Sequence, residues 1–248
     1  MTTKFHRRLI LYEGTYGVLA VPLTESDFTT IEAAAIALAE KLASIARRSI
    51  SSNGEAVLAL SGGRTPSLVF NHLRQLRLDW SRVTVTLTDE RWVPANHPDS
   101  NENLVRTQLL KGPAGAAKFV PLFGAEASPD AGLAACEARL AAMNSPIDAV
   151  YLGMGSDGHI ASLFPGTQAA LRSQRTMCVA VPAAADRHPR LSLSINTILK
   201  AGEILLLYAG QDKHDAYLTA KMTEDSSDNP LSLILCQQET PVSVLRAQ

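Results

Sequence analysis

Residues 147–161 read Ile-Asp-Ala-Val-Tyr-Leu-Gly-Met-Gly-Ser-Asp-Gly-His-Ile-Ala, and this stretch indicates the fold class of the chain. An apolar run ending at Leu152 is typical of a buried strand, and the glycines after it are typical of a turn at the strand's carboxyl end. Loops at the carboxyl ends of parallel strands form the ligand crevice of α/β proteins. Asp157 and His159 therefore occupy a place where catalytic side chains are expected. Taken alone, an Asx-turn beside a surface histidine would explain the two residues as well.

Gly153, Gly155 and Gly158 also fit the dinucleotide pattern G-x-G-x-x-G. That pattern needs a helix that begins inside the motif and an acidic residue about twenty positions further on. Here Phe164-Pro165-Gly166 breaks the chain within a turn or two, and the next carboxylate is Asp186. We therefore favour a catalytic loop over a dinucleotide site.

Short apolar runs alternate with longer helical patterns along the rest of the chain. Strands buried on both faces are expected at residues 56–60, 83–87, 149–152, 177–181 and 204–208. Helical spacing with polar starts covers residues 30–48, 67–76, 101–110, 130–143 and 211–222, and residues 190–195 alternate as in a further strand. This order predicts a single α/β domain over residues 1–248, Rossmann-like, with a mainly parallel β-sheet covered by helices on both faces.

The composition favours a protein that acts on a small molecule. The 248 residues carry 23 Lys and Arg against 24 Asp and Glu, so there is no basic field for nucleic acid or an anionic membrane. Cys136, Cys178 and Cys236 lie far apart in apolar segments, which indicates core packing in a reducing cytoplasm and no metal cage. After the basic residues 1–8 the apolar run is too short for a signal peptide. We expect a cytoplasmic monomer or small homo-oligomer with no nucleic-acid or membrane partner.

A second strand end carries Ser-Gly-Gly-Arg-Thr-Pro at residues 61–66. Its two glycines leave backbone N–H groups open to an anion, its hydroxyls add donors, and its proline suits a helix start. The residues Ser61, Gly62, Gly63, Arg64 and Thr65 therefore predict a phosphate cradle, although the spacing is not that of a Walker loop. A tight turn that uses glycine for steric reasons is the alternative.

Four further charged residues lie at the ends of predicted strands. Asp89 and Arg91 lie at the end of one strand, where charges are costly unless they pair or face a wet pocket. Arg190 and Lys213 each look like surface cations when taken alone. On two separate strand ends, however, they would complete a phosphate clamp, in which Arg supplies a planar fork and Lys a point charge.

The motifs form a set in order and spacing: S-G-G-x-T-P at residues 61–66, T-D-E-R-x-V-P at 88–94 with S-N at 100–101, and G-M-G-x-D-G-H-x-A-S-L-F-P-G at 153–166. In this set the chain resembles the 6-phosphogluconolactonases of the glucosamine-6-phosphate isomerase/6-phosphogluconolactonase family, and the resemblance extends from the alanine-rich segment 30–48 to Lys213. The isomerases of the family also have D-G-H but continue A-F-N-E-P-G. Residues 161–166 lack that glutamate, which favours the lactonases.

The resemblance implies an isomerase/deaminase-type fold and hydrolysis of 6-phospho-D-glucono-1,5-lactone to 6-phosphogluconate in the oxidative pentose phosphate pathway. It implies His159 as the catalytic base. The other site residues that it implies are Asp157, residues 61–65, Asp89, Arg91, Arg190 and Lys213. The chain departs from the family at Arg64, which replaces a small residue and whose contact with phosphate is open, and at Ile160, which replaces threonine.

These residues can perform the proton transfers that opening a lactone ring requires. A neutral imidazole near pH 7 accepts a proton from the attacking water and returns it to the ring oxygen, and a loop N–H or an arginine would stabilise the oxyanion. No metal motif and no G-x-S-x-G elbow occurs, so we expect neither metal nor cofactor. A sugar-phosphate isomerase is disfavoured by the missing glutamate, and a non-catalytic sugar-phosphate sensor by the retention of Asp157 and His159.

Overall fold

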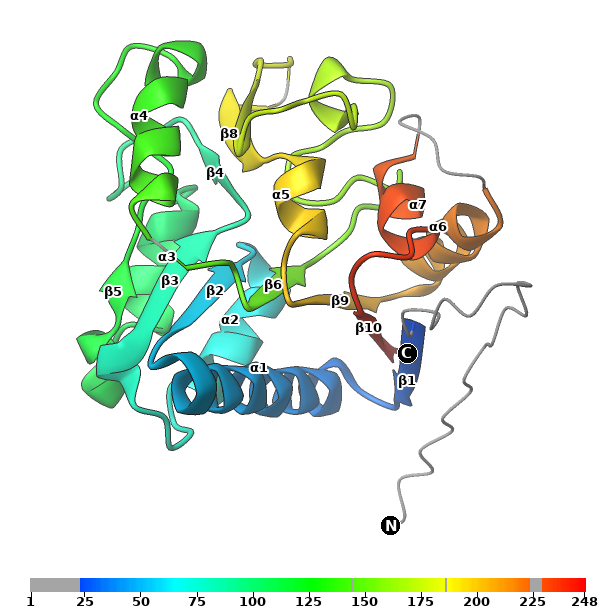
Figure 1. The fold of residues 1–248 in the computed structure, drawn as a ribbon. Helices are drawn as coiled ribbons and strands as arrows, with labels where there is room; N and C mark the ends of the chain where they lie inside the picture. Colours follow the sequence, from blue (N-terminus) through cyan, green and yellow to red (C-terminus); the bar gives the residue numbers. More distant parts are fainter. Residues whose placement is uncertain (1–22, 144, 186, 224–228) are drawn as a thin grey trace.

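Seven parallel strands form the central sheet of this protein, whose computed structural model describes residues 23–143, 145–185, 187–223 and 229–248 (Figure 1). The strand order is β1-β10-β9-β6-β2-β3-β5, and every neighbouring pair runs parallel. The strands are β1 (Leu23–Phe28), β2 (Ala56–Leu60), β3 (Val83–Leu87), β5 (Lys118–Phe119), β6 (Ala149–Leu152), β9 (Glu203–Ala209) and β10 (Val242–Ala247). The predicted parallel α/β sheet is therefore confirmed.

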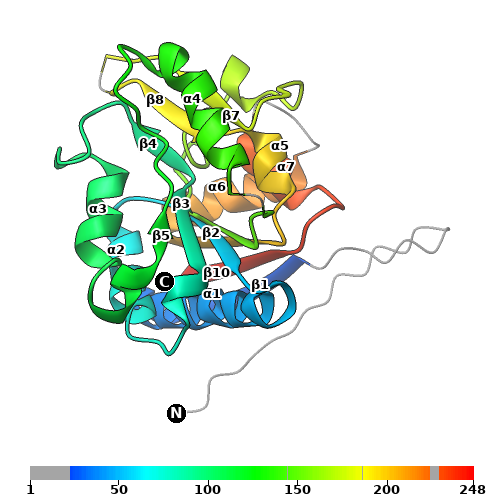
Figure 2. The same ribbon diagram turned by 60° about the vertical axis from the view of Figure 1, so that its left-hand side comes forward.

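Helices cover both faces of this sheet. They are α1 (Ile31–Asn53), α2 (Arg64–Leu73), α3 (Asn101–Gln108), α4 (Pro129–Ala141), α5 (Ile195–Leu199), α6 (Gln211–Met222) and α7 (Pro230–Leu235), with short 3₁₀ turns at Trp80–Arg82, Gly112–Ala116 and Gln168–Ala170. The two views place α1 and α2 on one face and α5, α6 and α7 on the other (Figures 1 and 2). None of the helices within the described ranges is long and apolar enough to cross a membrane.

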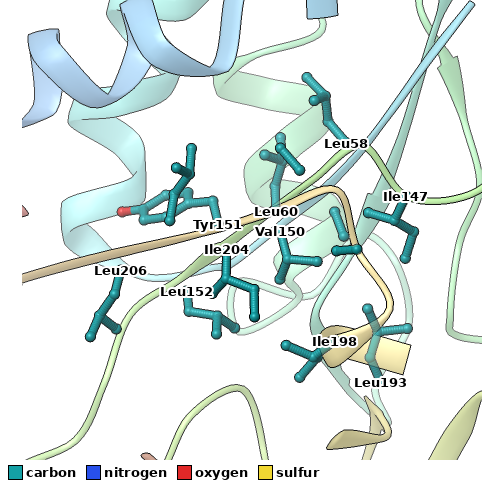
Figure 3. Close-up of a cluster of buried hydrophobic side chains, with 14 of the residues drawn as sticks. Leu58, Leu60, Ile147, Val150, Tyr151, Leu152, Leu193, Ile198, Ile204 and Leu206 are labelled. Atoms are coloured by element: carbon teal, nitrogen blue, oxygen red, sulfur yellow. The ribbon is translucent and has the colours of Figure 1, made fainter. Parts of the chain in front are cut away.

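The core lies between the sheet and these helices. All residues of β2, β3 and β6 are buried, as expected for strands covered on both faces. Figure 3 shows part of the cluster, with Leu58 and Leu60 of β2, Val150 and Leu152 of β6, and Ile204 of β9. Each fully buried side chain of this size contributes roughly 1.5–3 kcal/mol, and the charged residues near these three strands lie beyond the strand ends. That is where the chemistry of this chain is found.

A second, antiparallel sheet corrects two expectations. It consists of β4 (Asp89–Arg91), β8 (Arg190–Leu193) and β7 (Cys178–Val181), in that order. The predicted strand at 177–181 thus belongs to this small sheet and not to the parallel one, because an apolar run specifies burial but not a partner. Asp89–Arg91, expected at a strand end, is itself a strand. The pairing sets Arg91 opposite Arg190.

Other expectations differ in detail. α2 begins at Arg64, earlier than the expected residue 67, and α1 continues to Asn53, where Gly54 adopts a φ of 86° and ends it. The sequence patterns missed β1, β5, β10, α5 and α7. Cys136 and Cys178 are buried as expected, whereas Cys236 is only partly buried. The signal-peptide argument uses residues 1–8 and the dinucleotide argument uses Asp186, and these residues lie outside the described residues.

Candidate active site

A cavity of about 260 Å³ lies at the carboxyl ends of the central strands. It brings together ten of the eleven predicted site residues: Ser61, Gly62, Gly63, Arg64, Thr65, Asp89, Arg91, His159, Arg190 and Lys213. The eleventh, Asp157, contacts the cavity through His159. Two larger cavities, of about 910 Å³ around Arg77 and about 890 Å³ around Arg175, hold none of these residues. We assign the site by its chemistry and not by its size.

The loop after β6 holds His159 and Asp157. Gly158 has a φ of 84°, and its N–H donates to the carbonyl of Gly155 at 3.1 Å. A Cβ at Gly155 would lie 2.2 Å from the His159 ring, so only glycine leaves room for the imidazole. Within the described residues of this loop the chain forms turns and isolated β-bridges up to Gly166, and no helix begins inside the motif. The dinucleotide alternative therefore fails.

Asp157 orients the imidazole of His159. Its Oδ1 lies 2.6 Å from the ring Nδ1 and accepts the backbone N–H of His159 at 3.1 Å. Burial acts to raise the pKa of Asp157, but the hydrogen bonds and the charge of His159 outweigh burial and hold that pKa below its ordinary value. When the shared proton sits on Nδ1, the outer nitrogen Nε2 carries a free lone pair. The Phe164 ring packs 4.7 Å from the imidazole, centroid to centroid.

Two helices point uncapped N-termini at the cavity. α2 starts after Gly63, whose φ is 115°, and α6 starts after Gly210, whose φ is 96°, and neither N-cap makes a side-chain hydrogen bond. The other five α-helices of the described chain are all capped by a Ser, Thr or Asn side chain. Free backbone N–H groups and the helix dipole together favour an anion at both ends.

A buried network holds Arg190 beside the cavity. Ser162 Oγ donates to Asp89 Oδ2 at 2.5 Å and accepts from the Arg190 guanidinium at 3.2 Å, while that guanidinium lies 3.7 Å from Asp89 Oδ2. The Asp89 and Arg190 side chains are only 8% and 15% exposed, so Asp89 largely neutralises Arg190. Lys213 and Arg64, in contrast, form no ion pair with any residue that the structure describes.

Glu90 is a buried residue beside the cavity whose structural role the sequence did not reveal. It is fully buried, and its carboxylate accepts the backbone N–H groups of Arg91, Asn101 and Glu102 at 2.7–2.8 Å and the Ser100 hydroxyl at 3.0 Å. Burial raises the pKa of Glu90 although these four donors oppose it. Glu90 thereby fixes the start of α3, where Asn101 sits so close that a Cβ at Gly62 would collide with it.

Comparisons with known proteins agree with this geometry. The family described as Glucosamine-6-phosphate isomerases/6-phosphogluconolactonase matches residues 29–243. The chain belongs to this family.

Two relatives by sequence and one by structure are named as lactonases. A 6-phosphogluconolactonase of Rhizobium meliloti is 36% identical over 88% of this chain and 95% of its own length, and one of Pseudomonas aeruginosa is 40% identical over 80% and 85%. The crystal structure of a 6-phosphogluconolactonase from Shewanella baltica is 37% identical, has a TM-score of 0.86, and covers 90% of this chain and 97% of its own. A monomeric glucosamine-6-phosphate deaminase, 21% identical with a TM-score of 0.77, shares the fold.

Proposed function

We propose that this protein hydrolyses 6-phospho-D-glucono-1,5-lactone to 6-phosphogluconate, the lactonase step of the oxidative pentose phosphate pathway. The observation that carries the proposal is one cavity that holds both an oriented imidazole and two uncapped helix N-termini. The names of the relatives support the same reaction. Three free cysteines support a cytoplasmic location.

His159 is the general base of this proposal. Its Nε2 accepts a proton from a water molecule as the water oxygen bonds to the lactone carbonyl carbon, and the carbonyl oxygen becomes an oxyanion. The imidazolium is stabilised by Asp157 at Nδ1. When the bond between the carbonyl carbon and the ring oxygen breaks, the proton passes from His159 to that oxygen. The products are the free carboxylic acid and a hydroxyl group, so atoms and protons balance.

The other end of the cavity binds the phosphate. The backbone of residues 61–65 at the start of α2 supplies N–H donors, and Lys213 in the first turn of α6 supplies an uncompensated charge. Arg190 adds a guanidinium fork, although Asp89 already offsets much of its charge. Phosphate therefore anchors the substrate while the lactone carbonyl faces His159.

The residues after His159 separate this reaction from amino-sugar isomerisation. Phe164 stands where the isomerase pattern has glutamate, and its ring packs on the imidazole instead of carrying a proton. The test is to supply fresh lactone, follow acid release above the spontaneous rate, and run glucosamine 6-phosphate beside it. Loss of lactone no faster than in buffer would contradict the proposal.

A further inference from the structure

The Tyr151 hydroxyl lacks a hydrogen-bond partner among the described residues. Tyr151 lies on β6, its side chain is fully buried, and its oxygen is sealed from bulk water. The other two buried tyrosines differ, because Tyr208 bonds His214 at 3.0 Å and Tyr217 bonds Glu25 at 2.5 Å. Phenylalanine would fill the same volume without burying an unpaired hydroxyl, so the structure retains a group that the free protein does not use.

Tyr151 is one of the residues that line the cavity. In the sheet Tyr151 pairs with Leu60 on one side and Leu205 on the other, and Leu60 is the residue before the 61–65 segment. Tyr151 and this segment line the same cavity, and α2 begins there without a side-chain cap. Figure 3 shows the Tyr151 ring directed away from Ile147, Leu193 and Ile198, with its hydroxyl at the outer end.

The chemistry of the hydroxyl restricts its partner. Burial raises the pKa of Tyr151, so the oxygen keeps its proton and acts as a donor. A ligand atom that accepts this hydrogen bond must displace the apolar groups around the hydroxyl, so the bond has to be strong. An anionic oxygen forms a shorter and stronger, charge-assisted hydrogen bond than a neutral acceptor does. The neighbouring N–H groups of α2 also favour an anion.

We propose that the Tyr151 hydroxyl donates a hydrogen bond to a phosphate oxygen of the bound ligand and so selects phosphorylated over plain sugar acids. This assignment rests on the phosphate end of the proposed function. The bond forms as the 61–65 segment adjusts to the ligand, since the hydroxyl is sealed in the free protein. Tyr151 is therefore a specificity-determining residue of the cavity that Lys213 also lines.

The test compares Tyr151→Phe with Tyr217→Phe, a buried tyrosine outside the cavity whose hydroxyl has a partner. Binding of 6-phosphogluconate, inorganic phosphate and gluconate is measured by calorimetry, and Tm is measured without ligand. For Tyr151→Phe we expect an unchanged or higher Tm and a Kd for 6-phosphogluconate about five- to thirtyfold weaker, or roughly 1–2 kcal/mol. Tyr217→Phe should lower Tm and leave that Kd within about twofold.

Each result decides the assignment. Unchanged binding of both phosphate compounds by Tyr151→Phe would overturn the assignment. A fall in the Tm of Tyr151→Phe as large as that of Tyr217→Phe would also overturn it, because the Tyr151 hydroxyl would then have a partner in the free protein. Wild-type protein that binds 6-phosphogluconate through Tyr151 but leaves the lactone intact would uphold this assignment while refuting the lactonase. Wild-type protein that binds neither phosphate compound would remove the phosphate site itself.

Discussion

Replacing Asp157 by Asn tests whether this carboxylate orients and stabilises the His159 imidazolium. The substitution keeps the size of the side chain but removes the charge that lies 2.6 Å from Nδ1. A charge-assisted hydrogen bond contributes roughly 1.5–3 kcal/mol. Because 52% of the Asp157 side chain faces solvent, screening favours the lower half of that range. We therefore expect kcat to fall about ten- to thirtyfold, at 1.4 kcal/mol per tenfold change.

The assay follows acid release from fresh lactone and subtracts the spontaneous rate. His159→Ala in the same assay should lose roughly two to four orders of magnitude, the usual effect of a positioned general base. Glu32→Gln is the matched control, because it breaks an exposed carboxylate–histidine pair, that with His72, away from the cavity. An Asp157→Asn loss equal to that of His159→Ala would show that Asp157 itself transfers the proton, and full activity would show that its charge is irrelevant.

Three further predictions concern the phosphate end, acid stability and reaction class. Lys213→Ala should lower kcat/KM for the phosphorylated lactone roughly ten- to a hundredfold and barely change kcat/KM for plain gluconolactone, whereas equal losses on both substrates would indicate a structural role. Arg190→Ala should show the same selectivity. If the Arg64 side chain points outward, Arg64→Ala should cause no selective loss. The pKa of Asp157 is lowered in the folded protein, so its contribution to stability is present above about pH 4 and is lost in acid. The difference in unfolding free energy between wild type and Asp157→Asn should thus shrink below about pH 4, and a growing difference would contradict the assignment. Finally, no ammonia should be released from glucosamine 6-phosphate, even at high protein concentration; release that disappears in Asp157→Asn would establish a deaminase.

The sequence predicted most of the central sheet because β2 and β6 are apolar and fully buried, β3 alternates Val and Thr but is also fully buried, and β9 has the apolar, buried core Ile204 to Tyr208. It did not predict β1, whose residues Leu-Thr-Glu-Ser-Asp-Phe carry no apolar pattern and which forms a strand only by pairing with β10. The assignment of β7 failed for a related reason, since hydrophobicity does not distinguish a parallel from an antiparallel partner.

The sequence indicated the parts of the candidate site in which glycines and polar or charged residues occur together at the end of a strand. The motifs at residues 61–65 and 157–159 were recognisable in the sequence, and residues 61–65 and His159 line the cavity. Glu90 and Tyr151 were missed because their significance is three-dimensional. A carboxylate next to Asp89 gives no sign that it accepts two backbone N–H groups at the start of α3, and a tyrosine in an apolar run is interpreted as a core residue.

The cavity is assembled from segments that are distant along the chain, and this has a consequence for folding. The loop after β2, strand β4, the loop after β6, strand β8 and the first turn of α6 each supply side chains from well-separated positions. Contacts of such long sequence separation form late and slowly, after much loop-closure entropy has been spent. Catalytic competence should therefore appear only with the last docking step during refolding. Recovery of activity would then report completed folding more strictly than recovery of the helical circular dichroism signal does.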